Sequence, residues 1–180
     1  MDPIAGGVSN DYNYPPDPVN RSDLTGSLSD GDLIQGGACL QLLGWKGCAK
    51  AVRYAGDAIA IYDRESERRG ENMANSLTHF YLMVRLSKEF GREKALLLGT
   101  VHEVFGVSGG TADTERDYAN NKMGASYGRM AARENYSEQE IRALSYSMLD
   151  TGALHCISDS TGTSNGHTRN GTSCAERVPK

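Results

Sequence analysis

Three stretches in the middle of this chain carry imidazole, carboxylate and amide side chains at helical spacings. Imidazole and carboxylate groups suit general acid–base catalysis, and burial shifts their pKa values toward the working range. Amide groups can hold a substrate oxygen or orient a water. We therefore predict that the three stretches form one hydrolytic site. The predicted catalytic residues are His79, His102, Glu103, Asp117 and Asn121, and the predicted substrate-binding residues are Asn72, Asn75 and Asn120.

Each of these residues, taken alone, also has a simpler explanation. A single histidine in a helix stripe is often a core or surface residue. Asp117 has Arg116 and Lys122 nearby for an ion pair on the helix surface.

The same set also offers ligands to a divalent metal, because histidine and carboxylate are a common ligand combination. The zinc-protease pattern HExxH is excluded, since Gly106 stands where its second histidine would be. The metal ligands would be His79, His102, Glu103 and Asp117.

Helices must position these residues. The predicted helices cover residues 71–90, 92–105, 113–133 and 137–150. Gly70 and Gly91 bound the first, and Ser137 with Glu140 forms a capping box for the last. Three of these helices carry polar residues where an ordinary bundle would place leucine. We expect those polar faces to converge.

Glycines and charges suggest further local features. A glycine inside a helix is costly, so Gly99, Gly124 and Gly128 predict close approach of a neighbouring helix. Residues 39–62 predict one or two short helices, broken by glycines. The charged run "DRESERRG" at 63–70 is predicted to be a solvated helix end.

Composition and charge bound the overall organisation of the 180 residues. Large apolar side chains concentrate in the middle, so we predict one all-α domain of four to six helices, preceded by a short β- and turn-rich segment and followed by a flexible tail. The net charge of −4 argues against a stable nucleic-acid partner.

No stretch approaches the roughly 20 apolar residues of a transmembrane helix, and the start does not resemble a signal peptide. The predicted segments are 1–26, a linker at 27–37, the helical domain at 38–157 and the tail at 158–180.

Four cysteines flank the apolar region, two before it and two after it: Cys39, Cys48, Cys156 and Cys174. Their number allows three disulfide pairings, and the sequence does not choose among them. A bridge between the early and the late pair would tie the two ends of the domain together. Buried free thiols are the alternative.

Residues 2–26, "DPIAGGVSNDYNYPPDPVNRSDLTG", contain many turn-forming residues and two tyrosines at strand spacing. The order of Asp-Pro, two glycines, Asn-Asp-Tyr-Asn-Tyr, Asp-Pro-Val-Asn and Asp-Leu-Thr-Gly resembles the end of the core of RHS/YD-repeat proteins. One departure is Pro15-Pro16, where the spacer is usually looser.

The resemblance implies a context for the rest of the chain. In such proteins the repeats form a hollow β-shell, and the variable piece after this boundary is commonly a toxin used between competing bacteria. The resemblance therefore implies an upstream RHS β-shell, a cognate immunity protein as partner, and delivery into a target cell as the tip of a larger secreted protein. It does not name the reaction.

A second resemblance covers about 55 residues of the helical region. The order His79, His102-Glu103 and "DYANNKMG" at 117–124 is similar to an all-α domain at the tips of other RHS proteins. Thr78 departs from the basic residue expected before His79. This resemblance supplies no reaction.

Two classes of function stay open. The first is a hydrolase acting on a phosphodiester-containing substrate, which would be RNA, DNA or phospholipid. The second is a non-catalytic tip that binds a partner or perturbs membranes, for example through the leucines at 96–98. The helical periodicity argues against an ADP-ribosyltransferase, and the missing GxSxG elbow argues against a lipase triad.

Overall fold

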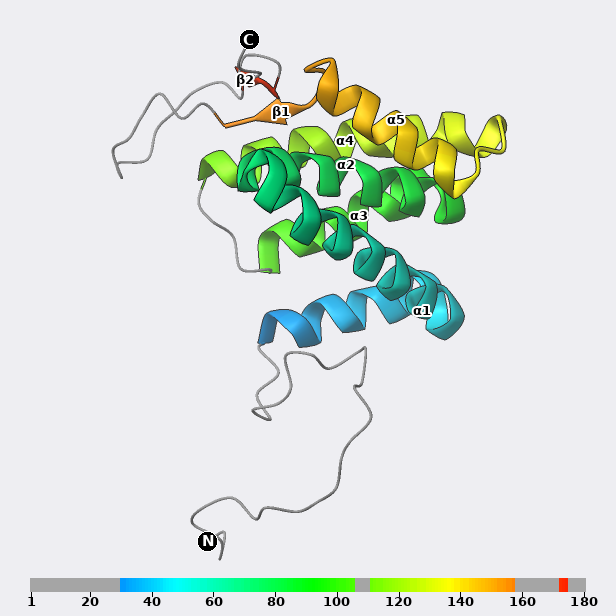
Figure 1. Cartoon of the computed structure of the whole chain (residues 1–180). Helices are drawn as coiled ribbons and strands as arrows, with labels where there is room; N and C mark the ends of the chain where they lie inside the picture. Colours follow the sequence, from blue (N-terminus) through cyan, green and yellow to red (C-terminus); the bar gives the residue numbers. More distant parts are fainter. Residues whose placement is uncertain (1–29, 106–110, 158–171, 175–180) are drawn as a thin grey trace, which may run out of the picture.

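The computed structural model describes residues 30–105, 111–157 and 172–174. Figure 1 shows a bundle of helices with a very short pair of strands at one end. The helices are α1 (Asp30–Arg69), α2 (Glu71–Phe90), α3 (Arg92–Phe105), α4 (Thr111–Arg133) and α5 (Glu138–Asp150), and the antiparallel strands are β1 (His155–Cys156) and β2 (Thr172–Ser173). The predicted all-α domain is confirmed, with five helices in the described ranges. The segment 1–26 and most of the predicted tail lie outside these residues.

The first helix differs from the prediction. It begins at Asp30, inside the segment predicted to be a linker, and continues as one kinked helix to Arg69. The kink is at Gly44, whose φ of 67° is left-handed and favours glycine because it has no Cβ. The kink divides α1 into an arm (residues 30–43) and a leg (residues 45–69). Gly47 and Gly56 do not interrupt the leg.

The disulfides join neighbours within each half of the chain. Cys39 pairs with Cys48 and so fastens the arm to the leg across the kink. Cys156 pairs with Cys174 and joins β1 to the residue after β2. No described cysteine is free. No bridge connects the early and late cysteines, so the disulfides constrain two local loops rather than the ends of the domain.

Helix α2 is the centre of the bundle, and it packs against α1, α3, α4 and α5. Its bounds are as predicted, between Gly70 and Gly91, which have φ values of 86° and 90°. Its buried side chains include Leu77, Phe80 and Val84, which form the core with residues of α1, α4, α5 and β1. Burial of apolar side chains such as these is the dominant favourable contribution to folding.

Two glycines of α4 allow this close packing, as predicted. A Cβ at Gly124 would stand 2.5 Å from the carbonyl oxygen of Phe80, and one at Gly128 would stand 2.7 Å from that of Val84. Both carbonyls belong to the backbone of α2, which cannot easily move. Gly99 of α3 is less crowded, since its Cβ would lie 3.3 Å from the side chains of Met83 and Asn121.

The charged run at 63–70 is not simply a solvated face. The side chain of Glu65 is fully buried, and it accepts hydrogen bonds from Arg64, Arg68 and Arg69 of its own helix and from Tyr146 of α5. Helix α5 begins with the predicted capping box between Ser137 and Glu140. In the described part of the chain no helix is long and apolar enough to cross a membrane.

Candidate active site

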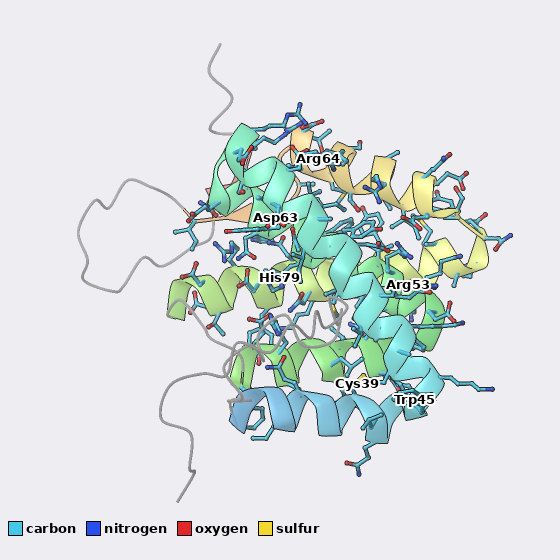
Figure 2. The ribbon with its side chains drawn as sticks, turned by 60° about the horizontal axis from the view of Figure 1, so that its bottom comes forward. Cys39, Trp45, Arg53, Asp63, Arg64 and His79 are labelled. Carbon is cyan, nitrogen blue, oxygen red and sulfur yellow. A yellow bond between two sulfur atoms is a disulfide. The ribbon has the colours of Figure 1, made fainter. Side chains whose placement is uncertain are left out.

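The five predicted catalytic residues come together between α2, α3 and α4. Figure 2 shows His79, on the central helix α2, inside the bundle. Its side chain is 14 % exposed. His102 and Glu103 approach it from α3, and Asp117 and Asn121 approach it from α4. Residues that lie far apart in sequence therefore surround one imidazole.

One side of the His79 ring faces the amide of Asn121, which in turn contacts the carboxylate of Glu103. Nδ1 of His79 lies 3.1 Å from Oδ1 of Asn121, and Nδ2 of Asn121 donates to Oε1 of Glu103 at 2.9 Å. Because the Asn121 amide nitrogen is the donor to Glu103, its oxygen accepts from Nδ1–H of His79. Nδ1 is also 3.5 Å from Oε1 of Glu103. Asn121 therefore fixes both the ring and the carboxylate.

The other side of the ring faces a second carboxylate. Nε2 of His79 lies 3.6 Å from Oδ2 of Asp117. Arg116 donates to both oxygens of Asp117, at 2.8 and 3.2 Å, and Asn75 donates to Oδ1 at 3.2 Å. The ion pair with Arg116, which was the simpler explanation of Asp117, is present, but it is buried and oriented toward His79 rather than placed on the helix surface. Asn75 orients this carboxylate.

The Glu103 carboxyl titrates unusually. Burial raises its pKa, and the negative charge of Asp117 acts in the same direction. The positive charge of His79 and the hydrogen bond from Asn121 oppose this but do not outweigh it. A carboxyl group whose pKa is raised in this way retains its proton to a higher pH than an exposed one and can act as an acid.

His102 is the exposed member of the set. Its ring centre lies 6.0 Å from that of His79, and its Nδ1 is 3.0 Å from Oε1 of Gln35 on the arm of α1. The arm therefore contributes one residue to the site. Sequence reasoning did not find Gln35, because nothing in the pattern of α1 shows that the kink returns the arm to α3.

A metal ion would have a partial ligand set here. His79, His102 and Glu103 each offer one ligand atom, and these atoms lie within 4.8 Å of one another. Asp117, the fourth predicted ligand, is already paired with Arg116 and Asn75. The arrangement fits acid–base chemistry more directly than metal binding.

Two predicted substrate-binding residues have a different role. Asn120 exchanges two hydrogen bonds with the backbone of His155, at 2.9 and 3.0 Å. Asn72 binds the backbone N–H and C=O of Ile157 and also accepts from Arg116. Their amide groups are thus used to hold the chain around β1 against α2 and α4. Helical spacing does not reveal where an amide points, so these hydrogen bonds were not foreseen; that the two residues bind substrate stays a prediction.

A cavity of about 350 Å³ begins at this cluster. His79, His102 and Asn121 contribute polar groups to its wall, together with Gln35 and Thr78. Most of the remaining wall is apolar. It comes from the leg of α1, from α2, from α3 and from the disulfide, through Cys39, Cys48, Ala51, Val52, Ala55, Ala58, Ile59, Leu82, Met83, Leu86, Leu98 and Val101.

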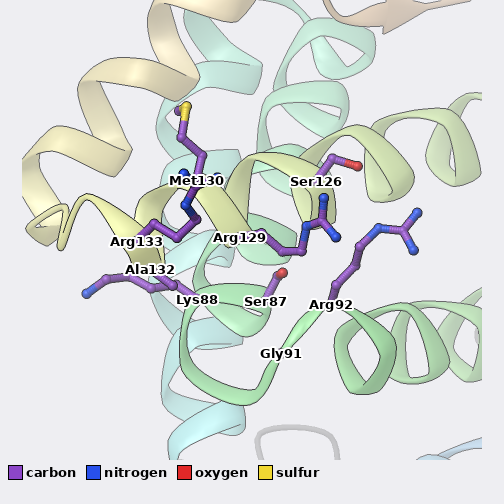
Figure 3. Close-up of a pocket in the computed structure, with 9 residues that line it drawn as sticks. All are labelled: Ser87, Lys88, Gly91, Arg92, Ser126, Arg129, Met130, Ala132 and Arg133. Atoms are coloured by element: carbon purple, nitrogen blue, oxygen red, sulfur yellow. The ribbon is translucent and has the colours of Figure 1, made fainter.

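A second hollow, of about 620 Å³, lies where the turn between α2 and α3 meets the end of α4. Figure 3 shows its four cationic side chains, which are Lys88, Arg92, Arg129 and Arg133. Its lining contains no imidazole and no carboxylate. It therefore lacks the groups that acid–base catalysis needs, and we place the chemistry at the first cavity.

No protein family matches this chain, and no solved structure matches it. Its function is therefore inferred from its own residues and their geometry. Of the residues that sequence reasoning missed, Arg116 is the most important to the site. It was considered only as a surface partner of Asp117, and its burial depends on how α4 packs.

Proposed function

We propose that this chain carries the effector domain of an RHS-type toxin and that the domain is a hydrolase of a phosphodiester-containing substrate. The convergence of His79 with two buried carboxylates at the wall of a cavity supports the hydrolase. The resemblance of residues 2–26 to the end of an RHS core supports the toxin context. In that context the domain has an upstream β-shell and a cognate immunity protein, and it is delivered into a target cell.

His79 is the proposed general base. In hydrolysis the oxygen of a water forms the new bond to phosphorus, a base takes the proton of that water, and the leaving oxygen receives a proton from an acid. When His79 takes a proton, its charge lies between the carboxylates of Glu103 and Asp117, which stabilise it. Asn121 keeps the ring in one orientation.

His102 is the proposed acid. It is exposed, it lines the same cavity, and its ring is close to that of His79. Gln35 accepts the hydrogen bond from Nδ1–H of His102, so when the ring is in its imidazolium form the proton on Nε2 is the one available to the leaving oxygen. Two imidazoles on one cavity can divide the two proton transfers between them.

The proposal is tested by expressing the 180-residue chain in a bacterial cytoplasm and in the periplasm, and by assaying the purified protein on RNA, DNA and phospholipid vesicles. His79→Ala should lower hydrolysis by about 100-fold or more, as expected for the loss of a general base. His102→Ala should also lower it. The thermal unfolding midpoint of both variants should stay near that of the wild type.

His155→Ala is the matched control, since this histidine lies on β1 and does not line the cavity. It should hydrolyse substrate like the wild type. If the wild type kills cells while His79→Ala and His102→Ala kill equally well as folded proteins, the catalytic proposal fails. The non-catalytic tip, which binds a partner or perturbs membranes, would then be the better explanation.

A further inference from the structure

The cavity beside His79 has one polar end and a long apolar body. On α2 its lining residues run from Thr78 to Leu86, a distance of eight residues or about 12 Å along the helix. On α3 they run from His102 back to Leu98. The imidazoles are thus at one end, and the leucines follow along both helices.

The lining excludes some ligands. It includes no lysine, no arginine and no phenylalanine, tyrosine or tryptophan. Sites for single-stranded nucleic acid combine a cationic groove with aromatic side chains on which bases stack. The cavity therefore does not fit RNA or DNA.

The mouth of the cavity is apolar as well. Val52 and Ile59 belong to the lining and are also exposed to solvent, by 42 % and 56 %. Trp45, beside the kink of α1, is 78 % exposed, and Leu40 of the arm is 48 % exposed. Figure 2 shows Trp45 and Cys39 near the kink of α1. Exposed apolar groups of this kind are typical of sites that contact a membrane or an apolar ligand.

We infer that the cavity binds one acyl chain of a phospholipid, with the polar head of the lipid at His79 and His102. The inference names the substrate class of the proposed hydrolase. That the lipid is hydrolysed rests on the proposed function, whereas binding of the acyl chain rests on the cavity itself. An acyl chain matches an apolar space next to polar groups, and its burial supplies the binding free energy. The disulfide Cys39–Cys48 forms part of the wall and holds the arm beside it.

The test uses saturated fatty acids of eight to fourteen carbons, which contain no bond that the protein could hydrolyse. Their dissociation constants for the full chain are measured by calorimetry below the concentration at which they form micelles. Each added methylene should tighten binding, by up to about fourfold, until the cavity is full. The heat-capacity change of binding should be negative.

Ala55→Phe places a ring in the cavity, and Ala60→Phe makes the same change on the same helix at an exposed position outside the lining. Ala55→Phe should weaken binding at least tenfold, and Ala60→Phe should leave it unchanged. If Ala55→Phe does not fold by circular dichroism, Val52→Phe at the exposed mouth replaces it, with the same expected direction.

The results separate this inference from the proposed function. Fatty-acid binding that does not depend on chain length, or that Ala55→Phe leaves intact, overturns the acyl-chain site. Absence of binding overturns it too, even if the wild type hydrolyses RNA and thereby supports the hydrolase. Chain-length-dependent binding without hydrolysis of any substrate supports the cavity assignment and contradicts the hydrolase.

Discussion

Glu65 and Glu103 are both buried glutamates, yet their surroundings differ in kind. Glu65 is surrounded by donors, which are three arginines and the hydroxyl of Tyr146. Burial alone would raise its pKa, but these hydrogen bonds and charges outweigh burial, so its pKa is lowered. Glu103 has one amide donor and a histidine, with a second carboxylate nearby, and its pKa is raised.

The difference separates a structural cluster from the proposed catalytic one. At Glu65 opposite charges and hydrogen bonds compensate the cost of burial, and none of these residues lines the cavity at His79. At Glu103 the compensation is incomplete, and the cluster opens into that cavity. Perturbed acids in a cavity are typical of functional sites, whereas satisfied ion-pair networks are typical of structural ones.

The largest expected effect on stability is that of Glu65→Ala. Removing this carboxylate leaves the hydroxyl of Tyr146 and the Nε–H of the partly buried Arg69 without their acceptor, although Nη1 of Arg69 keeps its pairing with Asp150. The free energy of unfolding should therefore fall by about 3–5 kcal/mol in urea titrations. Glu138→Ala is the control, because its half-exposed carboxylate also contacts two arginines. It should cost less than about 1 kcal/mol. Equal losses in the two variants would contradict a structural role specific to the buried cluster.

A smaller effect is expected from Tyr146→Phe. The hydroxyl of Tyr146 donates to Glu65 at 2.9 Å and accepts from Arg64 at 2.7 Å. Losing a hydrogen bond to a charged group should lower the free energy of unfolding by about 1.5–3 kcal/mol. Hydrolysis should be unchanged, as measured at a temperature where the variant is folded. A loss of activity in the folded variant would show that the two regions are coupled.

The smallest effect on stability is expected from Glu103→Gln, and its sign is opposite. The folded-state pKa of Glu103 is raised above 4.5. As pH rises above 4.5, ionising this carboxyl is therefore less favourable in the folded protein than in the unfolded chain, and the free energy of unfolding of the wild type falls. The variant has no such cost, and its stability relative to the wild type should therefore increase with pH in this range. Urea titrations at several pH values measure the difference.

The same pH series compares the two regions directly. The lowered pKa of Glu65 predicts that its contribution to stability is present above 4.5 and is lost as pH falls through its folded-state pKa. Glu65→Ala should therefore lower the free energy of unfolding less at acidic pH than at neutral pH. Glu103→Gln should likewise raise the free energy of unfolding, relative to the wild type, less at acidic pH than at neutral pH. A Glu103→Gln variant that loses stability relative to the wild type as pH rises would show that Glu103 is satisfied like Glu65.

Much of the fold follows from local sequence signals. Gly70 and Gly91 bound α2 as predicted, and Ser137 with Glu140 caps α5 as predicted. Such signals act within one or two turns of a helix, so they can be read from a short stretch. The kink at Gly44 was predicted as a break between helices, because a glycine in sequence does not show whether the chain stops or continues beyond it.

The candidate site was only partly predictable. Unexpected polar residues on inward faces pointed to His79, Glu103 and Asp117, and the structure brings these together. The same reasoning placed Asn72 and Asn120 beside a substrate, whereas both bind the backbone around β1. Helical periodicity gives the face on which a side chain lies, but it does not identify the hydrogen-bond partner.

Local spacing along the chain was enough to predict helices α2 to α5, their polar inward faces and the glycines that permit α2 and α4 to approach. These features depend on residues three or four positions apart. The three-dimensional packing was needed to show which cysteines pair, which glutamate has all its hydrogen bonds, and that the arm of α1 helps to enclose a largely apolar cavity beside His79. Those features depend on contacts between residues that are close in space through packing, and packing is a property of the whole bundle.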